Sequence, residues 1–340
     1  MTRSGRPTLD DVAREAGVSR MVASRAVNGA ANVSPRAAAR VHEAIAALGY
    51  VQHAGARAMA LNRTGTIGFI APMANQRFFA DPNVAAVLGG IKEVLQDSPI
   101  QLVTLIVEDQ QDQLKAARYV KGGHVDGVIV LTPELLEPLV VDIAGAGVPI
   151  AANGLVDGAP RMDSLVTDTR KGAGDMCTYL ARAGVTRCAV IAGQRDVPST
   201  WNMIAGIRDV FPGTSEDHIT FGDHTPEAGR NRMHELLDRD LGFDGVFVAS
   251  DVMASAALPV LIDRGFRVPD DVQLVGWDNS LPADTCRPSL TTMSIPFHGI
   301  GRSLASMLTD RINGAAGGRV TPVTTAIVRR GSSRPVRSPD

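Results

Sequence analysis

The sequence predicts a small all-α helix-turn-helix head followed by an α/β core of two doubly wound lobes. Three observations carry this prediction. A helix-turn-helix pattern fills residues 8–28, basic charge is concentrated in residues 1–63, and apolar strands alternate with helices from Thr66 onward. A chain of 340 residues is long enough for such a head and one large or two medium domains. We therefore expect the head at residues 1–63 and the core at residues 64–340.

The first two helices are marked by their caps. Thr8 and Asp11 form a capping-box pattern, in which the hydroxyl accepts from an early helical N–H and the carboxylate reaches back. Gly17 supplies the positive φ that ends this helix, and Ser19 caps the second. Two short helices joined by a tight turn can place the second helix in the DNA major groove. The outer side of that second helix is expected to carry Arg20, Met21, Ser24 and Arg25.

A third helix is expected from Ser34-Pro35, a cap followed by a first-turn proline, to about Leu48. Residues 1–63 hold nine arginines and four acidic residues, a net charge of +5. The other 277 residues hold 25 basic and 32 acidic residues, a net charge of −7. A basic head can neutralise phosphates and release counterions. These features favour a DNA-binding head over the alternative, a helical bundle that contacts proteins.

The composition is that of an ordinary soluble protein, with 44% apolar and 21% charged residues. The N-terminus lacks the apolar region of a signal peptide, and no stretch reaches the length of a membrane span. The three cysteines are odd in number and widely spaced, which favours isolated thiols in a reducing cytosol. The seven histidines are scattered, and no nucleotide-binding or nucleophile-elbow motif is present. We expect a cytoplasmic protein without membrane contact, metal or cofactor.

Strands and helices alternate through the core in two runs. In the first run, strands are expected over residues 66–72, 101–107, 125–131 and 149–153, with helices over residues 83–96 and 110–121 and after Pro133. In the second run, strands are expected over residues 164–168, 187–193, 242–250 and 271–278, with helices over residues 169–183, 200–211 and 252–264. Continuous apolar strands separated by helices are typical of parallel sheets covered on both faces.

An internal echo supports two similar lobes. His124–Leu131 and Gly242–Ala249, 118 residues apart, share the order apolar-Asp-Gly-Val-apolar-Val. We expect one lobe at about residues 64–159 plus 290–320 and the other at about residues 160–289 plus 321–340. Asp126 and Asp244 precede their strands, at the wrong end of the sheets for catalysis, and we expect no enzyme.

Ligands of open α/β sheets bind outside the carboxyl ends of the strands. The loops that follow the strands of both lobes should therefore face one another across a cleft, which is the default ligand site. These loops come after Ala71, Leu131, Asn153, Ala192, Ser250 and Trp277.

Over nearly its whole length the chain resembles the lactose-repressor-like (LacI/GalR) family of bacterial transcription regulators. The resemblance rests on the head, which reads TLDDVAREAGVS…SRAVNG…VSPRAAARVHEAIAALGY, and on the junction RTGTIGFIAP. It continues in the core stretch VFVASDVMASAALPVLIDRGFRVPDDVQLVGWDNS, in PSLTTMSIP and in VRRGSS. It implies a homodimer whose heads bind a near-palindromic DNA operator, and a core with the two-lobed fold of periplasmic sugar-binding proteins. No leucine heptad follows in the C-terminal residues, so a dimer is expected.

The resemblance also implies which head residues contact DNA. It places Ser19, Arg20, Met21 and Arg25 on the recognition helix, and it implies that Asn28 and Ser34 contact phosphate groups of the DNA backbone. Arg25 would reach a guanine edge, which offers two acceptors to a guanidinium, whereas Arg20 would contact either a base or a phosphate. Val22 and Ala37 depart from the family, which usually has threonine hydroxyls at these positions.

Residues 53–61 look like the family's hinge helix, which joins the head to the core and folds on DNA. Met59 stands where the family usually inserts a leucine into the minor groove. The alternative is that Met59 is an exposed apolar residue on a linker.

For the cleft, the family's sugar binders usually supply an arginine, an asparagine and an aspartate from the second lobe. The matching residues here are Met203, Ser250 and Asp278, so only the carboxylate remains. Asp278 is the foremost candidate, since it can accept hydrogen bonds from sugar hydroxyls; the alternative is a helix N-cap. Further candidates, each also explicable by ordinary packing or a polar strand end, are Trp277, His224, Asn153, Phe78 and Phe79.

The sequence therefore predicts a repressor of carbohydrate-related genes, controlled by a small polar effector that we expect to be a sugar. Loss of the usual arginine and asparagine leaves two interpretations. Either the effector is not a common monosaccharide, or the cleft has lost strong effector control. A further alternative is a cytosolic small-molecule-binding protein with a vestigial head.

Overall fold

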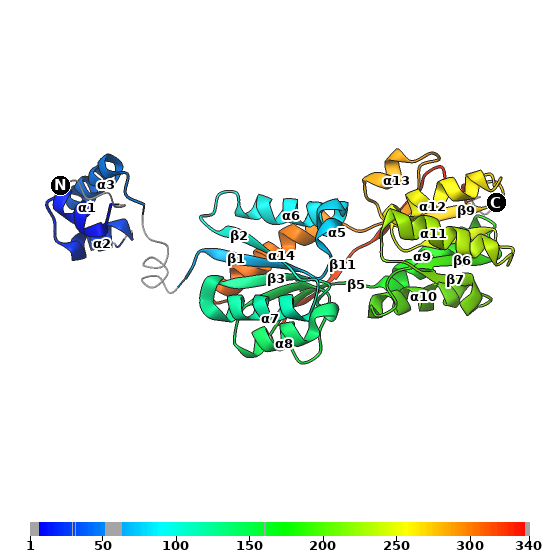
Figure 1. The fold of residues 1–340 in the computed structure, drawn as a ribbon, viewed down its shortest axis with the longest axis horizontal. Coiled ribbons are helices and arrows are strands. Elements are labelled where there is room, and N and C mark those ends of the chain that lie inside the picture. Colours follow the sequence, from blue (N-terminus) through cyan, green and yellow to red (C-terminus); the bar gives the residue numbers. More distant parts are fainter. Residues whose placement is uncertain (1–6, 29, 31, 52–62, 160, 337–340) are drawn as a thin grey trace. The chain divides into compact units, whose positions relative to one another are not determined.

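The computed structural model describes residues 7–28, 30, 32–51, 63–159 and 161–336. It divides into two compact units, one of residues 1–66 with 122–126 and one of residues 67–121 with 127–340 (Figure 1). None of the helices in these described ranges is long and apolar enough to cross a membrane.

The first unit contains the predicted helical head. Its helices are α1 (Leu9–Glu15), α2 (Arg20–Val27) and α3 (Pro35–Leu48). The capping box is confirmed, because the Thr8 backbone N–H donates to Asp11 Oδ2 at 3.0 Å and the Asp11 N–H donates to Thr8 Oγ1 at 3.3 Å. Gly17 adopts a φ of 60°, which lets the chain turn sharply into α2.

Small apolar residues form the core of the head. Val12, Ala23, Ala26, Val41 and Ala44 are buried where the three helices meet. Short side chains at these positions let the helix backbones approach one another closely, so a head of this size can still bury a contiguous core.

The second unit contains two six-stranded sheets. The first sheet has the order β11-β5-β4-β3-β1-β2, and β11, β5, β4, β3 and β1 pair in parallel. Its strands are β1 (Thr66–Ala71), β2 (Gln101–Ile106), β3 (Gly127–Leu131), β4 (Ile150–Asn153), β5 (Asp163–Thr167) and β11 (Val320–Val323). Its helices are α5 (Asn75–Ala80), α6 (Pro82–Leu95), α7 (Gln110–Tyr119), α8 (Glu137–Gly145) and α14 (Phe297–Ile312). We call this sheet and its helices lobe 1.

The second sheet has the order β12-β10-β9-β8-β6-β7 and is parallel except for β12, which runs antiparallel to β10. Its strands are β6 (Cys188–Ala192), β7 (Ile219–Phe221), β8 (Gly245–Val248), β9 (Gln273–Asp278), β10 (Thr291–Ser294) and β12 (Ala326–Val328). Its helices are α9 (Thr169–Arg182), α10 (Pro198–Val210), α11 (Pro226–Asp238), α12 (Asp251–Asp263) and α13 (Leu281–Thr285). We call this sheet and its helices lobe 2.

Helices cover both faces of each sheet, as the continuous apolar strands predict. In lobe 1, α6 and α14 pack together on one face and α7 and α8 lie on the other (Figure 1). In lobe 2, α11 and α12 pack together on one face and α9 and α10 on the other (Figure 1).

The chain divides between the lobes differently from the sequence-based expectation at three strands. β5 and most of β11 were expected in lobe 2 and β10 in lobe 1, but backbone pairing puts β4, β5 and β11 side by side in the first sheet and β10 beside β9 in the second. The chain therefore crosses between the lobes after β5, after β10 and between β11 and β12. Apolar strands of the two sheets are chemically alike, so the sequence pattern does not reveal which sheet a strand joins.

The repeated sequence pattern at residues 124–131 and 242–249 corresponds to the same hydrogen-bonding arrangement in two places. In the first unit, Asp126 accepts from the Thr64 N–H at 2.6 Å and the Gly65 N–H at 2.8 Å. In the second unit, Asp244 accepts from the Thr186 N–H at 2.9 Å and the Arg187 N–H at 2.7 Å. Each carboxylate ties the entry of its own strand to the entry of a neighbouring strand, so these aspartates have a structural role.

Close packing of α14 on α6 yields a stability prediction. A methyl group at Gly301 would lie 2.1 Å from the Val87 carbonyl oxygen, so Gly301→Ala should lower the free energy of unfolding by about 1–3 kcal/mol. In the same helix, a methyl group at Gly299 meets only Pro296 Cβ, at 3.7 Å. Gly299→Ala should therefore be neutral or stabilising. Urea unfolding of both variants checks this, and equal stabilities would contradict the packing described here.

Candidate functional site

The head presents its candidate DNA contacts on α2. Ser19, Arg20, Met21 and Arg25 are exposed, and the side chain of Met21 is 62% accessible. Arg20 forms an exposed ion pair with Asp10, with 3.3 Å between Arg20 Nε and Asp10 Oδ1. An exposed pair of this kind is weak, so the Arg20 guanidinium can exchange it for a phosphate or a base.

Three polar head residues are already used as caps. Ser19 Oγ accepts from the Val22 N–H, and Ser34 Oγ accepts from the Ala37 N–H, each at 3.3 Å. Each hydroxyl keeps a hydrogen that it can donate to a phosphate. Asn28 Nδ2 donates to the Ser24 carbonyl at 2.8 Å at the end of α2. The candidate Met59 and the expected hinge helix at 53–61 lie outside the described residues.

The second unit contains a cavity of about 230 Å³ lined by both lobes. Each of the six strand ends expected at the cleft contributes to its wall, through the last residue of the strand or the loop that follows it. These residues include Met73, Thr132, Asn153, Gly193, Ser250 and Asp278. A second cavity of about 550 Å³ shares six wall residues with the first. The shared residues are Thr132, Asn153, Thr169, Ser199, Trp277 and Phe297.

Six of the eight side chains predicted for the cleft line the first cavity. They are Asn153, Met203, His224, Ser250, Trp277 and Asp278. Two predictions fail. Phe78 is buried in the hydrophobic core with its ring centroid 6.3 Å from that of Phe69, and Phe79 is 79% exposed outside the cavity wall. Both residues lie on α5, a six-residue helix, and the sequence pattern did not predict which of its side chains face the core.

Asp278 lines the first cavity and is bonded to the opposite lobe. Its carboxyl group is buried at the end of β9, and Asn83 Nδ2 from α6 donates to Asp278 Oδ2 at 2.9 Å. This hydrogen bond joins lobe 1 to lobe 2. Asp278 is not a helix cap, because the cap of α13 is Ser280. Burial, together with the nearby carboxyl groups of Asp251 and Asp81, raises the pKa of Asp278 well above its ordinary value.

Asp251 holds the loop that carries Asp278. Asp251 is fully buried at the start of α12 and accepts from the Ser280 N–H at 2.7 Å and from Thr292 Oγ1 at 2.6 Å. Asp278 and Asn279 have φ values of 113° and 60°, which non-glycine residues rarely adopt. The hydrogen bonds to Asp251 and the bond from Arg330 to Asn279 Oδ1 at 2.7 Å keep this loop in its unusual conformation.

His224 supplies a neutral imidazole to the cavity wall. Its ring packs on Gly193, where a methyl group would lie 2.9 Å from His224 Nε2. Desolvation and the positive charge of Arg77 lower the pKa of His224 to about 4. At neutral pH the ring therefore offers one donor and one acceptor nitrogen.

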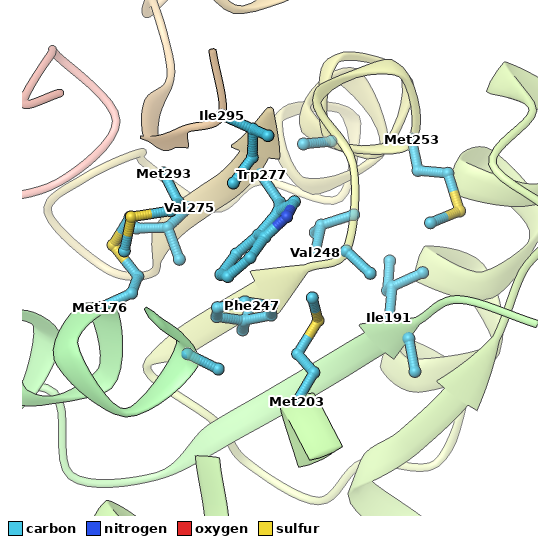
Figure 2. Close-up of a cluster of buried hydrophobic side chains, with 14 of the residues drawn as sticks. Met176, Ile191, Met203, Phe247, Val248, Met253, Val275, Trp277, Met293 and Ile295 are labelled. Carbon is cyan, nitrogen blue, oxygen red and sulfur yellow. The ribbon is translucent and has the colours of Figure 1, made fainter. Parts of the chain in front are cut away.

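Met203, Trp277 and Ser250 have structural partners in addition to their place in the wall. Figure 2 shows Met203 and Trp277 directed into one buried cluster with Phe247, whose ring centroid is 6.0 Å from that of Trp277. Ser250 caps α12, since its Oγ accepts from the Met253 N–H at 3.2 Å. Met203 and Trp277 thus give the cavity an apolar surface, while the Ser250 hydroxyl keeps a hydrogen that it can donate.

Several polar wall residues were not predicted from the sequence. They are Arg77, Asp81, Asn83, Thr132, Thr169, Ser199 and Thr200. Arg77 lies in α5, which the sequence pattern did not indicate as a helix, and Asp81 and Asn83 lie at the N-cap and in the first turn of α6. The signal that could have found them is their position: they follow the first strand of the core, where ligand-binding loops are expected.

Comparisons with known proteins agree with both units. The family model described as bacterial regulatory proteins, lacI family, matches residues 8–52, and a periplasmic binding protein-like domain matches residues 177–333. The HTH-type transcriptional regulator CelR of Thermobifida fusca is 37% identical over 320 residues, covering 92% of this chain and 94% of that protein. Catabolite control protein A of Priestia megaterium is 29% identical over 312 residues, covering 90% of this chain and 92% of that protein.

Two solved structures have the same fold. The transcriptional regulator CelR–cellobiose complex superposes with a TM-score of 0.73 at 34% identity, covering 96% of this chain and 100% of that chain. The lac repressor dimer bound to operator and the anti-inducer ONPF superposes with a TM-score of 0.82 at 23% identity, covering 96% and 99% of the two chains. The predicted helical head and two-lobed core are thereby confirmed.

The buried carboxyl of Asp251 predicts a pH dependence of stability. Burial raises its pKa from 3.8 to about 6. A raised pKa favours the protonated folded protein, so this contribution is full below about pH 4 and is lost as the pH rises through 6. Roughly 3 kcal/mol should be lost over this window.

The measurement is urea unfolding between pH 4 and pH 7. Asp251→Asn should flatten the fall in unfolding free energy, while the exposed control Asp97→Asn should retain it. Wild type and Asp251→Asn with the same pH dependence would show that Asp251 does not titrate in this range.

Proposed function

Since this chain belongs to the LacI family of bacterial transcription regulators, we propose that it represses carbohydrate-related genes under the control of a sugar bound between its lobes. The chain is a DNA-binding regulator, and its family is non-enzymatic. The repressor role and the sugar are the parts of this proposal that require experiment.

One observation carries the proposal of a sugar: loops from both lobes line a single cavity, whose wall includes the buried carboxyl group of Asp278. Asn83, Asn153 and His224 add an amide, a second amide and a neutral imidazole to the same wall. Such groups donate to and accept from hydroxyls without requiring a charged ligand. The apolar edge of Trp277 can contact the C–H face of a sugar ring.

An oligosaccharide is the sugar class that the cavities favour. The 230 Å³ and 550 Å³ cavities adjoin through six shared residues, and together they fall in the range of about 300–1,000 Å³ typical of ligand sites. A relative has been solved as a CelR–cellobiose complex, which makes cellobiose the first sugar to test.

For the DNA end, we propose a homodimer whose two heads bind a near-palindromic operator. A helix-turn-helix head recognises one half-site with its second helix, so two-fold symmetry of the protein requires two-fold symmetry of the DNA. The exposed side of α2, with Arg20, Met21 and Arg25, supplies the base-reading surface. Sugar binding would then shift the population between states that bind and release the operator.

A second candidate is a DNA-binding regulator with an atypical or lost sugar response. It is favoured by Met203, which packs into the core where the family has an arginine, and by Ser250, whose hydroxyl caps α12. A third, a small-molecule-binding protein with a vestigial head, would yield no enriched palindrome when the protein selects from random DNA.

Removal of the Asp278 carboxyl tests the sugar site. Asp278→Ala should weaken cellobiose binding by about 10–100-fold, because one or two hydrogen bonds to a carboxyl group are lost. Isothermal titration calorimetry measures this, with Asp209→Asn on the exposed surface as the control. If none of cellobiose, cellotriose, glucose or maltose gives heat or a melting shift with the wild type, the second candidate is favoured.

Truncation of Arg25 tests base reading. Arg25→Ala should lower the preference at one operator position by about 1–3 kcal/mol, since a bidentate contact to guanine would be lost. Arg14→Ala, an exposed arginine of α1 paired with Asp11, is the matched control and should leave base preference unchanged. Selection from random DNA followed by binding to single-base operator variants measures both. Uniform weakening across all sequences would identify Arg25 as a phosphate contact instead.

A further inference from the structure

The guanidinium of Arg77 is the unusual charged group of the cleft. Arg77 lies on α5 of lobe 1 and lines the 230 Å³ cavity. It also lines a second cavity, of about 580 Å³. Among the described residues that line these two cavities and the 550 Å³ cavity, Arg77 is the one lysine or arginine.

Arg77 has unused hydrogen-bonding capacity. Its Nε is buried and has no hydrogen-bond partner within the described structure. Its Nη1 donates to Gln194 Oε1 of lobe 2 at 3.4 Å, which is long for a charged donor. A guanidinium has five N–H donors, and a buried donor without an acceptor is costly. The packing around Arg77 does not account for this arrangement, whereas a ligand with several acceptor oxygens does.

The guanidinium and the carboxyl group of the site come from opposite lobes. Arg77 belongs to lobe 1 and Asp278 to lobe 2, and both line the same cavity. A sugar hydroxyl can accept from a guanidinium and donate to a carboxyl oxygen, so this pair suits a ring held between the lobes. Met203 does not offer such a donor, because its side chain is directed at Trp277 and Phe247 in the core (Figure 2).

We infer that Arg77 is a sugar-binding residue of this protein and that it donates from lobe 1 to the hydroxyl oxygens of an uncharged sugar. This inference rests on the proposed function. Arg77 gives the cleft a guanidinium group although Met203 stands where the family's sugar binders usually have an arginine. This guanidinium comes from lobe 1, whereas position 203 lies in lobe 2. Because Arg77 and Asp278 contact the sugar from two sides, the affinity for the sugar depends on residues of both lobes.

The surrounding charges specify an uncharged sugar. Asp81 and Asp278 line the same cavity as Arg77, so two carboxyl groups accompany one guanidinium. In the wall of the 580 Å³ cavity, Arg77 is joined by Glu108, Asp196 and Asp223. A phosphate or carboxylate on the ligand would be repelled by Asp81, Glu108, Asp196 and Asp223, whereas neutral hydroxyls can use both the donors and the acceptors. Asp278, whose pKa is raised, contributes a carboxyl oxygen as an acceptor.

The test is calorimetric titration of the full-length chain with cellobiose, glucose and glucose 6-phosphate. Arg77→Met keeps the length of the side chain and removes its donors, and it should weaken binding of the neutral sugar by about 10–100-fold. Arg77→Lys keeps the charge without the planar fork and should recover only part of the affinity. The matched control is Arg170→Met, an exposed arginine paired with Asp209, which should bind as the wild type does.

Two further variants separate sugar contact from a structural role. Gln194→Ala removes the hydrogen bond across the lobes, so a loss as large as that of Arg77→Met would show that Arg77 acts only through Gln194. Thermal melting without sugar should give Arg77→Met the same midpoint as Gln194→Ala, because both variants lose the bond between Arg77 Nη1 and Gln194 Oε1, and Arg77 Nε has no partner to lose. A melting midpoint of Arg77→Met well below that of Gln194→Ala would show that Arg77 is structural.

The outcomes also distinguish this inference from the proposed function. If the wild type binds a neutral sugar and Arg77→Met binds it equally well, the inference fails and the proposed function stands. If the wild type binds glucose 6-phosphate more tightly than the neutral sugars, the assignment of an uncharged ligand is overturned. If the wild type binds none of the three sugars, both the sugar proposal and the inference fail.

Discussion

The cleft depends on a carboxyl group that is buried without an ion-pair partner among the described residues. Asp251 accepts hydrogen bonds from Ser280 and Thr292 and thereby fixes the loop after β9, whose residues Asp278 and Asn279 have positive φ values. These hydrogen bonds stabilise a backbone conformation that non-glycine residues otherwise rarely adopt. Its position brings the Asp278 carboxyl within 2.9 Å of Asn83 Nδ2 in the opposite lobe. A single buried acid thus links the stability of lobe 2 to the geometry of the ligand site.

The two lobes use an aspartate in the same way at the start of a strand, and they differ at the ends of the strands that line the ligand site. Asp126 and Asp244 bind the backbone N–H groups at the entry of a neighbouring strand in equivalent ways. At the opposite ends of the strands the lobes are dissimilar, since lobe 1 supplies Arg77 and Asn83 and lobe 2 supplies Asp278. A repeated scaffold with unlike loops can hold a ligand asymmetrically, so that one face of the ligand meets donors and the other an acceptor.

The parts of this protein that could be predicted from the sequence are those set by local chemistry. The capping box of Thr8 and Asp11, the turn at Gly17 and the apolar strands of the core each depend on residues close together in the chain. The lobes of β5, β10 and β11 could not be predicted, because strand partners lie far away in the sequence. Arg77 was not predicted as a site residue for a related reason. It lies on α5, whose six residues are too few to show a helical period. What marks Arg77 as a site residue is its closeness to Gln194 and to the cavity, which are formed by residues far away in the sequence. Phe78 and Phe79 were overvalued because aromatic type alone does not fix the direction of a side chain.

The central claim is that one chain couples a DNA-binding head to a sugar in the cleft of its core. Coupling of two sites is a difference in binding free energy, typically equivalent to about 5–150-fold in affinity. The most direct measurement is the dissociation constant for a selected operator, by fluorescence anisotropy, with and without saturating cellobiose or whichever sugar binds in the calorimeter. The account predicts that the sugar changes the operator affinity by a factor in this range and that Asp278→Ala abolishes the change. An operator affinity that stays the same when the cleft is saturated with sugar would contradict it.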